Sequence, residues 1–236
     1  MEFYCRGIRP VVIGSDLYLC ILFCGCDFRC RYCYNKEILD FRKDYLTKIT
    51  SIKKELVKFN ADKVIFAGAE PCLQRQALLN LMRFCKNKDI KTLLYTNGAS
   101  PNALNSVLSE NLVDKVVFDI KSPFNELFNK VTRSETYFRN SKDIMKNIKK
   151  SLNLVKKSKV DYLIKTVIVP KLMYRKNHIL KIADEVSRQN CSWQLSQFIP
   201  GETTDKRYKG INPLSNEFIR TLKKICIKAY PELDIV

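Results

Sequence analysis

The chain has 236 residues, and its 42 lysines and arginines outnumber 24 aspartates and glutamates, which gives a formal charge of +18. Hydrophobic residues make up 46% and charged residues 28%, a globular composition that excludes a disordered chain. The single histidine, His178, excludes any zinc site or catalytic dyad that needs two histidines.

The N-terminal segment "MEFYCRGIRPVVIG" lacks the basic, apolar and small-residue regions of a secretory signal. The longest apolar run, Leu17–Cys24, is too short to cross a bilayer. We therefore expect a cytoplasmic protein with no membrane partner. The cytosol keeps thiols reduced, so the ten cysteines are not expected to form a disulfide framework.

Short apolar, β-branched runs alternate with longer segments of helical period along the chain. The predicted strands are Asp16–Phe23, Lys63–Gly68, Lys91–Asn97, Lys115–Ile120, Tyr162–Val169 and Trp193–Ile199. The predicted helices are Leu46–Phe59, Arg75–Asn87, Asn102–Glu110, Asp143–Lys157, His178–Gln189 and Asn216–Tyr230. This alternation predicts an α/β fold of parallel strands, in one domain over residues 1–236 with its core at about 16–230. The pattern alone leaves open a doubly wound sheet and an incomplete barrel.

Four consecutive predicted strands end in segments that suit an active site. The segment "CGCDFRCRYCYN" (residues 24–35) follows the first strand, and "AGAEP", "TNGAS" and "DIKSP" follow the next three. In parallel α/β folds the chemistry lies at these carboxyl ends of the strands. A protein that served only as a scaffold would not need polar or glycine-containing loops at all four.

The first of these segments contains Cys24, Cys26, Cys30 and Cys33. Structural zinc sites usually take two close pairs of ligands with a longer segment between them, and a redox pair of Cys30 and Cys33 would leave Cys26 unexplained. Three thiolates can instead hold three irons of a [4Fe–4S] cluster and leave the fourth iron open. Cys24 then becomes a packing thiol at the strand end. A zinc-containing, basic nucleic-acid-binding protein is the alternative from another class.

The spacing Cys26-x3-Cys30-x2-Cys33, with Tyr32 before the last cysteine, resembles the signature of the radical S-adenosylmethionine (radical SAM) enzymes. "FAGAEPCLQ" resembles the "GGEP" loop of that family, and "YTNG" and "VVFDIKSP" resemble the "DTNG" and "DIK" segments of its activating-enzyme branch. The nearest resemblance is to the activating proteins of anaerobic ribonucleoside-triphosphate reductases and of pyruvate formate-lyase. It implies a partial (β/α)6, TIM-like barrel with helices outside.

The resemblance also implies roles for individual residues. Cys26, Cys30 and Cys33 would be the catalytic cluster ligands, and Phe23, Phe28, Tyr32 and Tyr34 would shield the cluster. The residues expected to bind SAM are Gly68, Ala69 and Glu70 at its amino group, Thr96 and Asn97, Asp119 near the ribose and Lys121 at the carboxylate. Ala69 replaces the second glycine of the family loop, so we expect a backbone there that tolerates a Cβ atom.

The implied activity is that of an oxidoreductase in which the [4Fe–4S] cluster cleaves SAM to a 5′-deoxyadenosyl radical. The implied substrate is a backbone glycine in an anaerobic ribonucleotide reductase or a related glycyl-radical partner, with a flavodoxin or ferredoxin-like electron donor. RNA or a small molecule is the alternative substrate. Nucleic acid is the less favoured partner, because the lysines are scattered and lack interleaved aromatic residues.

Overall fold

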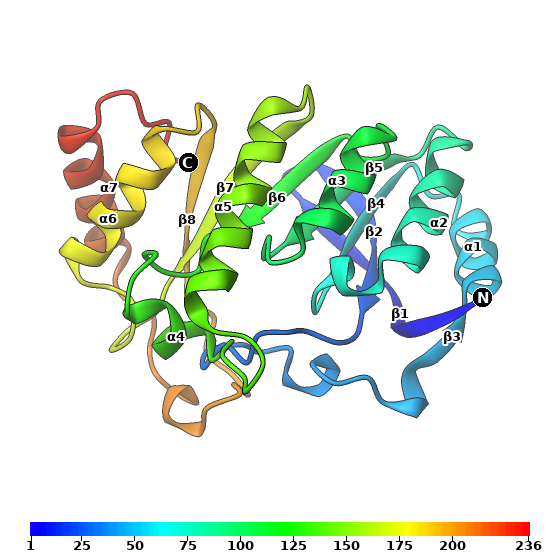
Figure 1. Ribbon diagram of the computed structural model, residues 1–236, viewed down its shortest axis with the longest axis horizontal. Coiled ribbons are helices and arrows are strands. Elements are labelled where there is room, and N and C mark those ends of the chain that lie inside the picture. Colours follow the sequence, from blue (N-terminus) through cyan, green and yellow to red (C-terminus); the bar gives the residue numbers. More distant parts are fainter.

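Eight strands form one curved sheet in the computed structural model, which describes residues 1–236 (Figure 1). The strand order across the sheet is β3-β1-β2-β4-β5-β6-β7-β8. The strands are β1 Glu2–Ile13, β2 Asp16–Phe23, β3 Leu46–Lys48, β4 Lys63–Gly68, β5 Lys91–Thr96, β6 Lys115–Asp119, β7 Asp161–Ile168 and β8 Ser192–Gln197. β2 and β4 to β8 run parallel, and the sheet does not close on itself. The predicted fold, a partial barrel of parallel strands, is confirmed.

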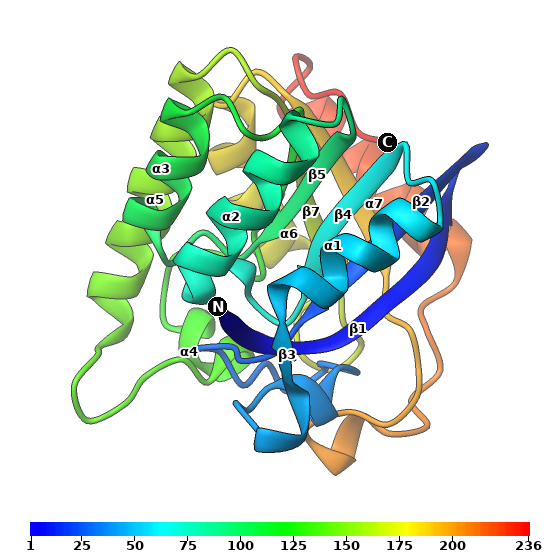
Figure 2. The ribbon, with the colours of Figure 1, turned by 90° about the vertical axis from the view of Figure 1, so that its right-hand side faces the viewer.

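Helices cover the outer face of this sheet, as Figures 1 and 2 show from two sides. The α-helices are α1 Ile49–Lys58, α2 Arg75–Lys86, α3 Pro101–Ser109, α4 Leu127–Thr132, α5 Ser141–Lys157, α6 Lys176–Ser187 and α7 Asn216–Ala229. Short 3-10 helices lie at Lys36–Ile38, Lys43–Tyr45, Pro71–Gln74 and Lys206–Tyr208. None of the helices combines the length and the apolar sequence that a membrane span requires.

Capping side chains and apolar stripes explain where the longer helices form. Asn140 caps α5 by accepting a hydrogen bond from the backbone N–H of Asp143, and Ser215 caps α7 in the same way from Phe218. The buried positions of α5 are spaced three or four residues apart, which gives the helix one apolar face. They are Ile144, Ile148, Ser151, Leu152 and Val155.

All six predicted strands and six predicted helices are present, and two strands and one α-helix were not predicted. These are β1, β3 and the short helix α4. The helix predicted from Leu46 instead begins at Ile49, because Leu46–Lys48 pairs with the start of β1.

The sequence of β1 hides its extended structure. Gly7 has a φ of 112°, and the pairing of β1 with β2 shifts register between Cys5 and Ile8. Such a bulge breaks the alternation of apolar and polar residues by which a strand is predicted. Pro10 has no N–H to give to a neighbouring strand, which an edge strand tolerates. Phe3 and Cys5 of β1 pack in the hydrophobic core, although β1 lies before residue 16, where the core was expected to begin.

The two faces of the sheet have different surroundings. Side chains on the outer face, including Phe23, Phe66 and Phe118, join a hydrophobic core of 53 buried residues beneath the helices. The alternate positions face inward, and only four buried residues form a hydrophobic group there: Cys20, Ile65, Leu93 and Val117. The rest of the inner face is left for a cavity.

Candidate active site

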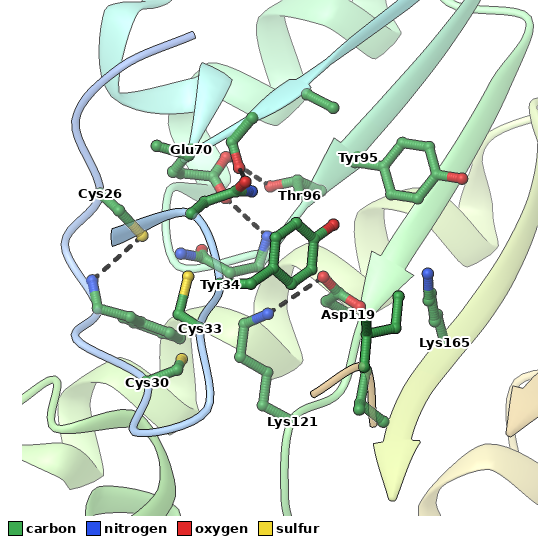
Figure 3. Close-up of a pocket in the computed structure, with 18 of the residues that line it drawn as sticks. Cys26, Cys30, Cys33, Tyr34, Glu70, Tyr95, Thr96, Asp119, Lys121 and Lys165 are labelled. Atoms are coloured by element: carbon green, nitrogen blue, oxygen red, sulfur yellow. Dashed lines mark hydrogen bonds and ion pairs between the residues drawn. The ribbon is translucent and has the colours of Figure 1, made fainter. Parts of the chain in front are cut away.

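A cavity of about 420 Å³ opens on the inner face at the carboxyl ends of the parallel strands (Figure 3). Its wall contains twelve of the residues that the sequence predicted for the site: Cys26, Cys30, Tyr32, Cys33, Tyr34, Gly68, Ala69, Glu70, Thr96, Asn97, Asp119 and Lys121. The fold therefore brings the four predicted strand-end loops to one place.

The three cysteines of the triplet lie on the loop that follows β2, which we call the cysteine loop (residues 24–35). Figure 3 shows their sulfur atoms near one another at the cavity wall. Hydrogen bonds from the backbone N–H groups of Arg29 and Arg31 to the residues at the end of α4 fix the loop from outside. Cys24 is fully buried and does not line the cavity.

Glu70 is the most enclosed carboxylate of the site, with 1% of its surface exposed. Its Oε1 accepts hydrogen bonds from the Cys72 N–H at 3.0 Å and the Thr96 hydroxyl at 2.9 Å. Its Oε2 accepts one from the Asn97 N–H at 2.7 Å, which leaves this oxygen able to accept another donor. Burial raises the pKa of Glu70 to about 7 in spite of these donors.

The backbone before Glu70 is held against the end of β2. Gly68 has a φ of 107°, and a Cβ atom there would lie 2.7 Å from the Phe23 carbonyl oxygen, so only glycine fits. Ala69 is not among the residues with positive φ, which confirms the prediction of a backbone that accepts its Cβ. The side-chain amide of Asn35 donates to the Gly68 carbonyl at 2.8 Å and ties this turn to the cysteine loop.

Asp119 and Lys121 face the cavity from the end of β6 and form an ion pair, with 3.1 Å between Oδ2 and Nζ. Burial lowers the pKa of the Lys121 ammonium, but Asp119 and Tyr32 outweigh burial and hold it well above its usual value. Lys165 of β7 also lines the cavity, over the ring of Tyr95.

One sequence expectation was wrong. Phe23, expected to shield the cluster, faces the outer core and packs against Phe3 and Phe66. Since side chains alternate along β2, Leu22 faces the cavity and Phe23 cannot. Phe28 does line the cavity, as expected.

Three residues that the sequence did not predict complete the surroundings of the site. Asp27, between two of the cysteines, accepts hydrogen bonds from the side chains of Asn97 at 2.9 Å and Arg139 at 2.9 Å. Asn35 is the third. The only signals in the sequence are an acidic residue, Asp27, within the cysteine triplet and an amide, Asn35, just after it. Neither signal indicates which residue it bonds to.

Comparison with known proteins identifies the family. The model of the radical SAM superfamily matches residues 20–186, which is more than half of the chain. The chain belongs to the radical SAM superfamily. The matched residues contain the cysteine loop, Glu70, Asp119 and Lys121, so they include the whole set of predicted site residues.

Two relatives with similar sequences belong to the activating-enzyme branch of the superfamily. This radical SAM enzyme is 30% identical over 206 residues to a Methanocaldococcus jannaschii protein provisionally named a glycyl-radical enzyme activating enzyme, covering 86% of this chain and 82% of that protein. It is 27% identical to the pyruvate formate-lyase-activating enzyme of Clostridium pasteurianum, over 74% of this chain and 71% of that one. A radical SAM methyltransferase from Sphaerobacter thermophilus shares the fold, with a TM-score of 0.72 at 11% identity over 96% of this chain and 67% of that chain.

The residues present fit the cofactors that radical SAM enzymes use. Three cavity-lining thiols are the donor set of a [4Fe–4S] cluster with one open iron. Burial raises the pKa of the Cys30 thiol to about 12 and raises those of Cys26 and Cys33 as well. Iron binding to these thiols therefore releases protons.

Proposed function

We propose that this radical SAM enzyme installs a glycyl radical on a partner protein, an anaerobic ribonucleotide reductase or a related reductase. The observation that carries the proposal is the 30% identity to the M. jannaschii protein over most of both chains. The similarity to the pyruvate formate-lyase-activating enzyme of C. pasteurianum supports the same branch.

In this proposal Cys26, Cys30 and Cys33 would hold a [4Fe–4S] cluster, and SAM would bind beside it in the cavity. When bound and reduced, the cluster supplies the electron that cleaves SAM to methionine and a 5′-deoxyadenosyl radical. The chain binds and orients SAM and excludes water, and no general base is needed. Tyr32, which is buried, and Phe28 cover the cysteine loop on the cavity side.

Glu70 is suited to the amino group of SAM. Its Oε2 retains acceptor capacity, and an N–H donated by the amino group of SAM would favour the ionised carboxylate, against the burial that raises its pKa. Lys121 is suited to the carboxylate of SAM, and Asp119 to the ribose hydroxyls. The Lys121 ammonium has three N–H donors and the Asp119 carboxylate has a second oxygen, so both groups can contact the cofactor while they keep their ion pair.

A protein substrate suits the open sheet. Val11 and Ile13 of β1 line the cavity from one side of the sheet, and Ser196 and Gln197 of β8 line it from the other. Because these two strands do not pair, the cavity can admit an extended segment that carries the target glycine. Four of the six lysines of α5 gather on one side of the helix and do not line the cavity, which disfavours RNA as the substrate; they are Lys146, Lys149, Lys150 and Lys157.

The test uses the reconstituted enzyme under anaerobic conditions with SAM, a reductant and a candidate anaerobic reductase from the same source. We expect a glycyl-radical doublet in the electron paramagnetic resonance spectrum and one 5′-deoxyadenosine per radical formed. The Cys30→Ala variant is the control and should give neither signal. Formation of 5′-deoxyadenosine only on addition of RNA, without a protein radical, would reject the proposal in favour of RNA modification.

A further inference from the structure

The outer side of the cysteine loop carries an excess of arginine. Three guanidinium groups converge on the carboxylate of Asp205, from Arg31 at 2.8 Å, Arg133 at 3.0 Å and Arg207 at 2.7 Å. The Asp205 side chain is only 8% exposed, so it is enclosed by these cations. One carboxylate cannot neutralise three guanidinium groups, and the group keeps positive charge toward solvent.

A fourth arginine extends the charge along the same loop. Arg139 pairs with Asp27 at 2.9 Å, and Asp27 lies next to Cys26. Four guanidinium groups thus face two carboxylates, which leaves a net charge of +2 among these six residues.

Two aromatic residues directly precede Arg139 in the sequence and are almost fully exposed. Tyr137 is 96% exposed and Phe138 is 90% exposed, and their rings pack edge to face with 5.1 Å between centroids. They occupy the tip of a tight turn that the paired residues Thr136 and Arg139 close. Exposed aromatic rings and arginines are the residue types enriched at the centres of protein interfaces.

We call Arg31, Arg133, Arg139, Arg207, Tyr137 and Phe138 the arginine–aromatic surface. The segments that carry it form backbone hydrogen bonds with the cysteine loop. The Arg31 N–H donates to the Val131 carbonyl at 3.1 Å. The Thr204 N–H donates to the Cys33 carbonyl at 3.0 Å, and the Asp205 N–H to the Arg31 carbonyl at 3.0 Å. None of its six residues lines the cavity. The cysteine loop therefore lies between this surface and the place where SAM would react.

We propose that the arginine–aromatic surface is the docking site of an acidic one-electron carrier protein. The aromatic pair provides the apolar contact, and the excess arginine charge attracts and orients an acidic partner. In the transfer step the reduced carrier loses one electron and the oxidised [4Fe–4S] cluster gains it, with no bond made or broken. The proposal rests on the cluster assignment made above, and it does not depend on the identity of the substrate.

The position of the surface favours a carrier over the glycyl-radical partner. The substrate must offer a hydrogen atom inside the cavity, and none of the six surface residues lines the cavity. An electron has no such requirement and needs only a short path to the cluster. The hydrogen bond from Thr204 to the carbonyl of Cys33 gives a docked carrier that path.

The test uses the reconstituted enzyme and an acidic flavodoxin as the probe. The dissociation constant is measured by fluorescence titration at low and high salt, and cluster reduction by flavodoxin hydroquinone or by dithionite is followed by absorbance. We expect the double variant Tyr137→Ser/Phe138→Ser to bind flavodoxin roughly tenfold or more weakly. Its reduction by dithionite, a small molecule that needs no docking site, should stay at the parent rate. Arg207→Gln should weaken binding less, and mainly at low salt.

Matched controls separate this effect from a general change of surface. Phe59→Ser removes an aromatic residue that is 57% exposed at the end of α1, and Lys91→Gln removes a cation as exposed as Arg207 at 70%. Both should bind flavodoxin like the parent. The proposal is overturned if the double variant binds flavodoxin as tightly as the parent, or if it loses affinity for the glycyl-radical partner alone. Absence of a glycyl radical even with the parent enzyme would reject the proposed substrate and leave the docking result intact.

Discussion

The outer and inner faces of the sheet are made by the same strands, but the outer face builds the hydrophobic core and the inner face lines the cavity. Outward side chains join the core of 53 buried residues, and inward side chains form a buried group of four and otherwise line the cavity. In β5, Leu94 points outward and its neighbour Leu93 points inward. The difference teaches that stability comes mainly from the helix-covered face, which leaves the inner face free to carry buried charges and thiols.

The largest expected effect is loss of the cluster when a thiol that lines the cavity is removed. Cys26→Ala, Cys30→Ala or Cys33→Ala should each abolish the intact cluster, because a three-thiolate site has no replacement ligand. Cys24→Ala is the matched control from the same loop and should still assemble it, since Cys24 lies outside the cavity. Iron content and visible absorbance after anaerobic reconstitution measure this. A Cys24→Ala protein without a cluster would show that the triplet is wrongly assigned.

The adjacent leucines of β5 compare the faces with one substitution. Leu94→Ala should lower the free energy of unfolding by about 4 kcal/mol, since the close-packed outer core cannot fill the space it leaves. Leu93→Ala should cost about 2 kcal/mol, because this side chain belongs to the small inner group beside a cavity. Urea unfolding of the proteins without cofactor measures both. Equal losses would contradict the division of labour between the faces.

Glu70 makes the stability of the cofactor-free protein depend on pH. The pKa of this carboxyl group is raised from 4.5 to about 7, so folding favours the protonated form. That stabilisation is present below pH 4.5 and is lost as pH rises through 7, a change of about 3 kcal/mol. Glu70→Gln cannot ionise and should lack it. We expect the parent to lose stability relative to Glu70→Gln between pH 5 and pH 8 in urea titrations, and parallel pH profiles would show that the carboxylate is ionised throughout.

The smallest effect concerns affinity for SAM. Lys121→Ala should weaken SAM binding by about 1.5–3 kcal/mol, because it removes a charge-assisted contact to a carboxylate. Lys115→Ala is the control. Lys115 lies at the start of β6, the strand that Lys121 follows, and it pairs with Asp161 away from the cavity. Anaerobic calorimetry on the cluster-containing proteins measures both, and identical affinities would remove Lys121 from the site.

The parallel strands and the cavity residues could be predicted because their signals are local. Each parallel strand is a short apolar run with a turn after it, and each site residue belongs to a motif next to a strand end. β1 could not be predicted, because Gly7 and Pro10 break its pattern and its pairing with β2 supplies the extended structure. The role of Asp27 could not be predicted either, since its partners Asn97 and Arg139 are 70 and 112 residues away in the sequence.

The edge of β1 has a consequence for how copies of this protein meet. β3 covers only Glu2 to Tyr4, so the remainder of that edge offers unpaired backbone groups to any other extended chain. A second copy adding its own strand there would meet the bulge at Gly7 and then Pro10, which cannot donate a hydrogen bond. The charge of +18 adds repulsion between identical molecules. β1 is thus a poor template for self-association.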